Sequence, residues 1–304
     1  MSGQEPMVCL EEFEKWYAVI HAVKNLDLEV GRGEAFVLLG SNGSGKSTIL
    51  RAVAGLHAPS SGRVIVDGID VAEDPLAARG RIAYLPQRVV LPDLLTGREV
   101  LSFYAGLKGA DQRRVGEVIE LIGLDEDADR FAREYSGGML QRLGLGITFL
   151  CDVPLYLLDE PTLNLDPGGV EQFRRWMEDR VAGGATVLFT SHILQEALRL
   201  ADRVAVMAEG ELVKVEEVSG FRNRVVGATT VSVVVDRLTE TMVEAAREAG
   251  AEEASWNDKS YSFRAPPEKR QAVIRAIEKA GGFIEELHTE PPNWESLAQL
   301  VSER

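Results

Sequence analysis

The chain has 304 residues, and its 48 acidic side chains outnumber its 33 Lys and Arg side chains, for a net charge of −15. That length is enough for two domains that each bury a core. The acidic surface argues against partners held through Lys and Arg clusters, so we expect no nucleic-acid binding and no electrostatic attachment to anionic lipid. Cys9 and Cys151 lie far apart, which predicts neither a disulfide framework nor a zinc site and indicates a reducing, cytoplasmic location.

The N-terminal residues do not have the pattern of a targeting segment. Gln4, Glu5 and Pro6 stand where a signal peptide would need a basic start and an apolar core. No stretch approaches about 18 consecutive apolar residues, the length of a membrane-spanning helix. We therefore expect a globular chain that does not insert into a membrane by itself.

The first part of the chain alternates short apolar runs with glycine-rich turns and helical stretches, which predicts a doubly wound α/β domain. The predicted strands, several of them apolar at almost every position as strands buried on both faces should be, are Ala35–Leu39, Val64–Val66, Ile82–Leu85, Leu155–Leu158, Thr186–Thr190 and Val204–Met207. The polar, glycine-ended segment Phe221–Gly227 is interpreted as a connection. This places one domain at residues 1–222 and a second at residues 228–304.

The second domain is predicted to be a small α+β module. Its expected elements are a strand (Thr230–Val235), a helix (Glu240–Ala249), a hairpin across Asn257 and Asp258, a helix (Glu268–Ala280), a strand (Phe283–His288) and a last helix (Asn293–Glu303). The order βαββαβ, with an extra helix, is that of a ferredoxin-like sandwich.

A phosphate-binding loop is predicted directly after the strand Ala35–Leu39. Its residues, which lead into a predicted helix, are Gly40, Ser41, Asn42, Gly43, Ser44, Gly45, Lys46, Ser47 and Thr48. The glycines allow backbone N–H groups to turn towards phosphates, Lys46 can reach the β and γ oxygens, and the Ser47 hydroxyl can ligate Mg²⁺. The motif in this strand, loop and helix context predicts a nucleoside triphosphate site.

Two further segments add groups suited to phosphate chemistry. The strand Leu155–Leu158 ends in Asp159 and Glu160, at the sheet edge where α/β proteins bind ligands. Asp159 can hold Mg²⁺ through water, and Glu160 can polarise an attacking water. Ser136, Gly137 and Gly138 precede a helix-forming segment, and such a helix N-terminus offers several N–H donors to an anion.

These motifs stand in the order and spacing of the ATP-binding-cassette (ABC) ATPases, together with Gln87, Asp166 in Leu165-Asp166-Pro167 and His192 in Thr190-Ser191-His192. The chain resembles that family over roughly residues 7 to 220. The resemblance implies a P-loop NTPase fold with a mixed sheet and a helical signature subdomain, and ATP hydrolysis with ATP and Mg²⁺ as cofactors.

The resemblance also implies roles for single residues. Tyr17 is similar to the aromatic that stacks on adenine, although a core aromatic is the alternative. Gln87 is similar to the residue that links Mg²⁺ and the lytic water to the membrane partner, and His192 to the γ-phosphate switch. Glu160, His192, Gln87 and Lys46 are then the catalytic group, and Ser47, Gln87 and Asp159 the metal group.

Family members form head-to-tail homodimers in which the Ser-Gly-Gly segment of one subunit closes on ATP held by the other. Ser136 and Gly138 would therefore act in trans, with Asp166 at the dimer seam. Two positions depart from the usual signature, since Tyr135 and Met139 stand where Leu and Gln are usual. The anion-binding segment itself is retained, so we expect activity.

The leading functional hypothesis is the ATP-binding subunit of an ABC transporter whose membrane permease is a separate chain, which would hold the protein at the inner face of the cell membrane. A helical, apolar stretch, Val89–Leu95 followed by Val100–Leu107, is the expected permease groove, with core packing as the alternative. A soluble ABC ATPase of DNA repair or translation is a second hypothesis. The C-terminal domain is expected to be a regulatory or dimerising module.

Within the family, the ending of the chain resembles bacterial ABC-2-type subunits. The Ser-Gly-Gly-Met phrase and the length favour a NosF-type ATPase of nitrous-oxide reductase maturation. Multidrug, antibiotic, lipid or haem-related export subunits are the alternatives. The sequence names neither the transported substrate nor the direction of transport.

Overall fold

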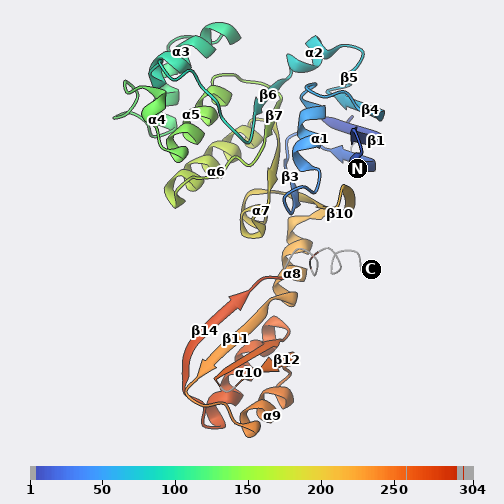
Figure 1. Cartoon of the computed structure of the whole chain (residues 1–304), viewed down its shortest axis with the longest axis vertical. Coiled ribbons are helices and arrows are strands. Elements are labelled where there is room, and N and C mark those ends of the chain that lie inside the picture. Colours follow the sequence, from blue (N-terminus) through green and yellow to red (C-terminus); the bar gives the residue numbers. More distant parts are fainter. Residues whose placement is uncertain (1–4, 258, 293–296, 298–304) are drawn as a thin grey trace. The chain divides into compact units, whose positions relative to one another are not determined.

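The computed structural model describes residues 5–257, 259–292 and 297, and their contacts divide the chain into Met1–Glu216 and Glu217–Arg304 (Figure 1). The strands of the first unit are β1 (Val8–Tyr17), β2 (Ile20–Val30), β3 (Ala35–Gly40), β4 (Ser61–Val66), β5 (Ile69–Asp70), β6 (Ile82–Leu85), β7 (Leu155–Leu158), β8 (Thr186–Ser191), β9 (Arg203–Ala208) and β10 (Glu211–Glu217). Its helices are α1 (Lys46–Val53), α2 (Pro75–Arg79), α3 (Gly97–Lys108), α4 (Arg114–Leu121), α5 (Gly137–Phe149), α6 (Pro167–Ala182) and α7 (Leu194–Leu200), with a 3₁₀ turn at Ala132–Glu134.

The central sheet of the first unit has the strand order β10-β9-β3-β8-β7-β6, and the pairs from β9 to β6 are parallel. Every residue of β3, β7 and β8 is buried, because helices and a second sheet cover both faces. That second sheet is antiparallel, with the order β2-β1-β4-β5. The predicted α/β fold with a mixed sheet arrangement is confirmed.

Helices α3, α4 and α5 pack on one another and form a separate group beside the central sheet (Figure 1). The expected helical stretch at Val89–Leu95 is wrong, because these residues are irregular and contain Pro92. A proline lacks the backbone N–H that a helix interior needs. Helix α3 begins later, where Thr96 and Glu99 form a capping box.

The second unit contains α8 (Val218–Ala228), β11 (Thr230–Val235), α9 (Glu240–Glu248), β12 (Glu252–Trp256), β13 (Ser260–Arg264), α10 (Pro267–Lys279) and β14 (Ile284–Glu290). Its sheet has the order β12-β13-β11-β14 with antiparallel pairs, and side chains of α9 and α10 share one core with its strands. The predicted βαββαβ order is confirmed. The expected last helix, Asn293–Glu303, lies outside the described residues apart from Leu297.

The segment Phe221–Gly227, expected to be a connection, is helical and belongs to α8. Val218, Phe221 and Val225 are buried there at spacings of three and four residues. That spacing gives a helix one apolar face. The arginines and the glycine that suggested a loop occupy the remaining positions of the same helix.

Candidate nucleotide site

A cavity of about 500 Å³ lies at the carboxyl edge of the central sheet. Five stretches of the chain form its walls: the end of β1 with the start of β2, the P-loop, the segment after β6, the segment after β7, and the turn before β10. The residues that line it are Tyr17, Ile20, His21, Ala22, Asn42, Gly43, Gly45, Lys46, Ser47, Thr48, Gln87, Glu160, Glu209 and Gly210. The structure thus brings together most of the predicted site residues; Ile20, His21, Ala22, Glu209 and Gly210 were not foreseen.

The P-loop connects β3 to α1 in a conformation that only glycine fits at one position. Gly45 has φ of 102°, and a Cβ atom there would lie 2.8 Å from the Ala22 carbonyl oxygen. Helix α1 begins at the next residue, so its N-terminal N–H groups face the cavity edge. A helix N-terminus of this kind stabilises phosphate.

Lys46 is buried, and its Nζ donates hydrogen bonds of 2.8 Å to the carbonyl oxygens of Gly40 and Ser41. Burial lowers the pKa of this ammonium, while Glu160 and Asp159 act in the opposite direction. A buried cation whose hydrogen bonds go to neutral carbonyl groups can bind an incoming anion more strongly than these partners.

Asp159 lies at the centre of a hydrogen-bonded group at the end of β7. Its Oδ1 accepts from Ser47 Oγ at 2.9 Å and from Thr190 Oγ1 at 2.8 Å, and Thr190 Oγ1 accepts from the Glu160 N–H at 2.8 Å. Asp159 Oδ2 is buried without a hydrogen-bond partner among the described residues. A carboxylate and a hydroxyl are the hard oxygen ligands that Mg²⁺ prefers, so the residues present fit this ion.

Glu160 is buried, and its backbone takes φ of 52°, a strained value for a residue with a Cβ. Its Oε2 lies 2.6 Å from His192 Nδ1. The structure therefore places the carboxylate and the imidazole of the predicted catalytic group in direct contact, at the wall of the cavity.

The Ser-Gly-Gly segment lies elsewhere in the same chain. Ser136 caps α5 by accepting from the Met139 N–H at 3.3 Å, and neither it nor Gly137, Gly138 or Asp166 is among the described residues that line the cavity. A Cβ on Gly138 would lie 2.7 Å from the Asn164 carbonyl oxygen, so this position requires glycine.

Tyr135, one of the two departures from the usual signature, is buried. Its hydroxyl donates to the Asp127 carbonyl oxygen at 2.7 Å, and a Cβ on Gly97 would lie 2.2 Å from it. The tyrosine is therefore a packing residue of the helical group. Met139 is half-buried on the first turn of α5.

Sequence reasoning missed two residues that connect α5 to the catalytic loops. Buried Gln141 donates from Nε2 to the carbonyl oxygens of Glu160 and Pro161, at 3.2 and 3.0 Å. Arg142 pairs with Asp166, the N-cap of α6. The signal in the sequence was the adjacent polar pair Gln141 and Arg142, just after the Ser-Gly-Gly motif in a largely apolar helix.

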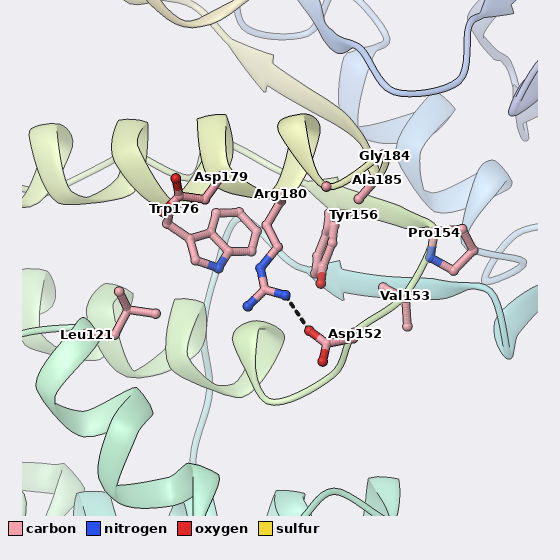
Figure 2. Close-up of a pocket in the computed structure, with 11 residues that line it drawn as sticks. Leu121, Asp152, Val153, Pro154, Tyr156, Trp176, Asp179, Arg180, Gly184 and Ala185 are labelled. Atoms are coloured by element: carbon pink, nitrogen blue, oxygen red, sulfur yellow. Dashed lines mark hydrogen bonds and ion pairs between the residues drawn. The ribbon is translucent and has the colours of Figure 1, made fainter.

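A second cavity of the first unit, of about 750 Å³, is not the nucleotide site. It lies at the other edge of the sheet, where Asp152–Pro154 precede β7, and Figure 2 shows Arg180 crossing it towards Asp152. Arg180 and Arg114 both pair with Asp152, so that carboxylate is already neutralised. Ligands of open α/β sheets bind at the opposite, carboxyl edge.

Comparison with known proteins agrees with this geometry. The family model described as ABC transporter matches residues 23–163. The linearmycin resistance ATP-binding protein LnrL of Bacillus subtilis is 31% identical over 245 residues, covering 79% of each chain. The daunorubicin resistance ATP-binding protein DrrA2 of Streptomyces coeruleorubidus is 32% identical over 297 residues, covering 94% of this chain and 92% of the relative. The chain belongs to the ABC transporter ATP-binding proteins.

Solved structures of the same family carry the same fold. An ATP-binding subunit of an ABC transporter superposes with a TM-score of 0.66 and 30% identity, over 71% of this chain and 92% of its own. A dimeric ATP-binding cassette in a post-hydrolysis state, bound to ADP and Pi, gives a TM-score of 0.65 and 29% identity over 70% and 99%. The first unit is therefore an ABC ATPase domain. No helix among residues 5–257, 259–292 and 297 is long and apolar enough to span a membrane.

Proposed function

We propose that this ABC ATPase is the motor subunit of an exporter for a drug-like or antibiotic molecule, with a separate permease. The observation that carries the proposal is the alignment with a daunorubicin resistance protein over 94% of this chain, which extends through both units. The linearmycin resistance protein adds a second relative whose name refers to resistance. Among the drug, antibiotic, lipid and haem-related alternatives, these two relatives support the drug and antibiotic ones.

In the proposed mechanism the P-loop holds the triphosphate. Lys46 exchanges its two carbonyl partners for the β and γ oxygens, which replaces neutral hydrogen bonds with charge-assisted ones. Ser41, Asn42, Gly43, Ser44, Gly45 and Thr48 complete the loop around the phosphates. The Ser44 hydroxyl is buried without a hydrogen-bond partner among the described residues, which leaves it available to a phosphate oxygen.

Ser47, Asp159 and Gln87 would hold Mg²⁺, which would neutralise charge on the phosphates as the terminal group leaves. Glu160 would polarise the attacking water, and His192 would hold the Glu160 carboxylate and sense the γ-phosphate. The Thr190 hydroxyl donates to the Asp159 carboxylate and accepts from the Glu160 N–H, so it fixes these two groups relative to each other. Hydrogen bonds among the protein's own residues hold Ser47, Asp159, Thr190, Glu160 and His192 in this arrangement, which supports a preorganised site.

The active assembly in this proposal is a head-to-tail homodimer. Ser136, Gly137 and Gly138 lie off the cavity of their own chain, which supports their action on ATP held by a second copy. Asp166 is anchored by Arg142 near that segment, at the proposed seam.

The permease is proposed to dock on the surface of the helical group. Phe103 and Leu107 on α3, and Val90 and Leu94 in the segment that leads into α3, are exposed large apolar residues, with Leu94 70% exposed. Gln87 lines the cavity three residues before Val90, so this surface is joined to the γ-phosphate end of the site. Membrane association of the acidic chain would then depend on the permease. The second unit, residues 217–304, is proposed to be an accessory regulatory or dimerising module.

The test is coexpression with the membrane protein that copurifies with the chain. The complex should hydrolyse ATP and lower the accumulation of an amphipathic antibiotic in cells, and Glu160→Gln should abolish both effects. A NosF-type motor would show the same ATPase but would copurify with a permease required for nitrous-oxide reductase maturation, and would leave antibiotic accumulation unchanged. That outcome would overturn the exporter assignment and keep the ATPase.

A further inference from the structure

The base end of the nucleotide cavity contains a hydrogen bond that the motifs do not predict. The Tyr17 hydroxyl lies 2.5 Å from Nδ1 of His57, with either atom able to donate, and the two rings meet edge to face at a centroid distance of 5.6 Å. Tyr17 lines the cavity, whereas His57 does not and is half-buried behind it. His57 therefore contacts the wall of the cavity from outside.

The segment His57–Ser60 is bound to the end of β1 at three further points. Lys15 Nζ donates to the Ala58 carbonyl oxygen at 2.6 Å, the Trp16 N–H donates to Ser60 Oγ at 3.0 Å, and the Ser60 N–H donates to the Glu14 carbonyl oxygen at 2.8 Å. These bonds fix the backbone of the strand end. The bond to His57 differs from these three, because it reaches the Tyr17 side chain and restricts the orientation of its ring.

His57 is also attached to the helix that follows the P-loop. Its N–H donates to the Arg51 carbonyl oxygen in the last turn of α1, at 3.3 Å. His57 thus connects the Tyr17 ring, which would meet the base, to helix α1, which begins at the P-loop.

We propose that His57 is the positioning residue for the nucleotide base, holding the Tyr17 ring in the orientation that stacks on a purine. This deepens the proposed nucleotide-binding role of Tyr17 and rests on it. Lys15 Nζ lies 5.2 Å from the centre of the Tyr17 ring, so a cation already occupies one face. A tyrosine free to rotate about its side-chain torsions would lose part of the stacking contact with a base on the other face.

The protonation of His57 suits this role. Burial, with smaller contributions from Arg51 and Lys15, lowers the pKa of the ring, so it is neutral at neutral pH. A neutral imidazole has one donor and one acceptor nitrogen, and Nδ1 can bond the hydroxyl in either tautomer.

The test compares MgATP with magnesium tripolyphosphate, which has the phosphates and no base. His57→Phe keeps a ring edge beside Tyr17 but removes the nitrogen, and Tyr17→Phe removes the same hydrogen bond from the other side. Each should weaken MgATP binding by about three- to tenfold, the effect of one lost hydrogen bond, and leave tripolyphosphate binding unchanged. The double variant should be no weaker than either single variant, because both remove one interaction.

His57→Asn, whose amide can occupy the place of Nδ1, should restore most of the MgATP affinity. Tyr156→Phe serves as a matched control, since it removes a 2.7 Å bond to the Cys151 carbonyl oxygen at the opposite sheet edge and should leave both ligands unaffected. MgATP binding unchanged in His57→Phe, or equal weakening of tripolyphosphate, would overturn the inference. Wild-type protein that bound neither ligand would instead refute the nucleotide site itself.

Discussion

The Glu160 carboxylate and the His192 imidazole are in direct contact, with Oε2 of Glu160 2.6 Å from Nδ1 of His192. Glu160 lies two residues after the end of β7 and has a strained backbone, and His192 is the residue that directly follows β8. Two neighbouring parallel strands therefore deliver the two groups to one point of the sheet edge, as their parallel pairing requires.

Glu160→Gln should retain MgATP binding and lose hydrolysis by about a hundredfold or more, because the amide keeps the shape but cannot act as a base. The ATP-bound dimer should then persist. Turnover and gel-filtration mass measured with ATP check this, with the exposed Glu211→Gln as control. Hydrolysis near the wild-type rate would remove Glu160 from the mechanism.

Lys46→Ala should weaken nucleotide binding itself by about ten- to a hundredfold, since charge-assisted hydrogen bonds to the phosphates are lost in the ground state. The carbonyl groups of Gly40 and Ser41 also lose a donor. Titration with a fluorescent ATP analogue measures the affinity, and Lys108→Ala at the end of α3 is the control. An affinity within about twofold of wild type would be inconsistent with this role.

Mixtures of two inactive variants should recover activity if Ser136 acts in trans. Ser136→Arg places a long side chain at the dimer seam, and Lys46→Ala damages the P-loop wall. A mixed dimer has one site with both defects and one with neither, so up to half of the wild-type rate should return unless the two sites are strictly coupled. Mixing wild type with a chain that carries both changes is the control. No recovery with proven mixed dimers would favour action in cis or strict coupling.

Val90→Asp combined with Leu94→Asp should abolish recruitment to membranes that contain the permease, because both changes put charge on the exposed apolar surface of the helical group. MgATP binding should be unaffected. Membrane flotation after coexpression measures recruitment, with Leu76→Asp, exposed on α2, as a matched control. Recruitment that persists until residues 217–304 are removed would move the docking site to the second unit.

The stability of the protein should fall more steeply in acid when His57 is present. The pKa of His57 is lowered in the folded state, whereas the ring titrates near pH 6.5 when unfolded. As the pH falls below about 6.5 the unfolded chain binds the proton first, so the free energy of unfolding decreases through that window. Thermal unfolding at about pH 7 and about pH 5 should show a smaller loss for His57→Phe than for wild type. An equal loss would contradict the shift.

Short-range patterns predicted most of the fold. The strand Leu155–Leu158 and the P-loop after Ala35–Leu39 were predictable because apolar runs and glycine spacing determine local backbone conformation. The segment Phe221–Gly227 was misjudged because its composition suggested a loop, while burial in the folded unit makes it helical. Composition counts the polar residues on the exposed face of such a helix together with the apolar residues on its buried face, so it does not reveal the apolar spacing.

Contacts between distant segments were not predictable in the same way. The bond between Tyr17 and His57 depends on the end of β1 packing beside the residues that follow α1. The local sequence pattern does not predict this contact between distant segments. Thr190 illustrates the intermediate case, since its position beside Ser191 and His192 was known but its bonds to Asp159 and Glu160 were not.

The buried amide of Gln141 connects helix α5 to the loop after β7 through two hydrogen bonds. If α5 moved away alone, the carbonyl oxygens of Glu160 and Pro161 would lose their bonds to this donor inside the protein, at a cost of about 1–3 kcal/mol for each group left unpaired. We therefore expect a displacement of α5 to move the backbone of Glu160 with it. In the proposed head-to-tail dimer, these two hydrogen bonds would couple the position of the Ser-Gly-Gly segment, which would meet the ATP of the second subunit, to the position of Glu160 beside the chain's own ATP.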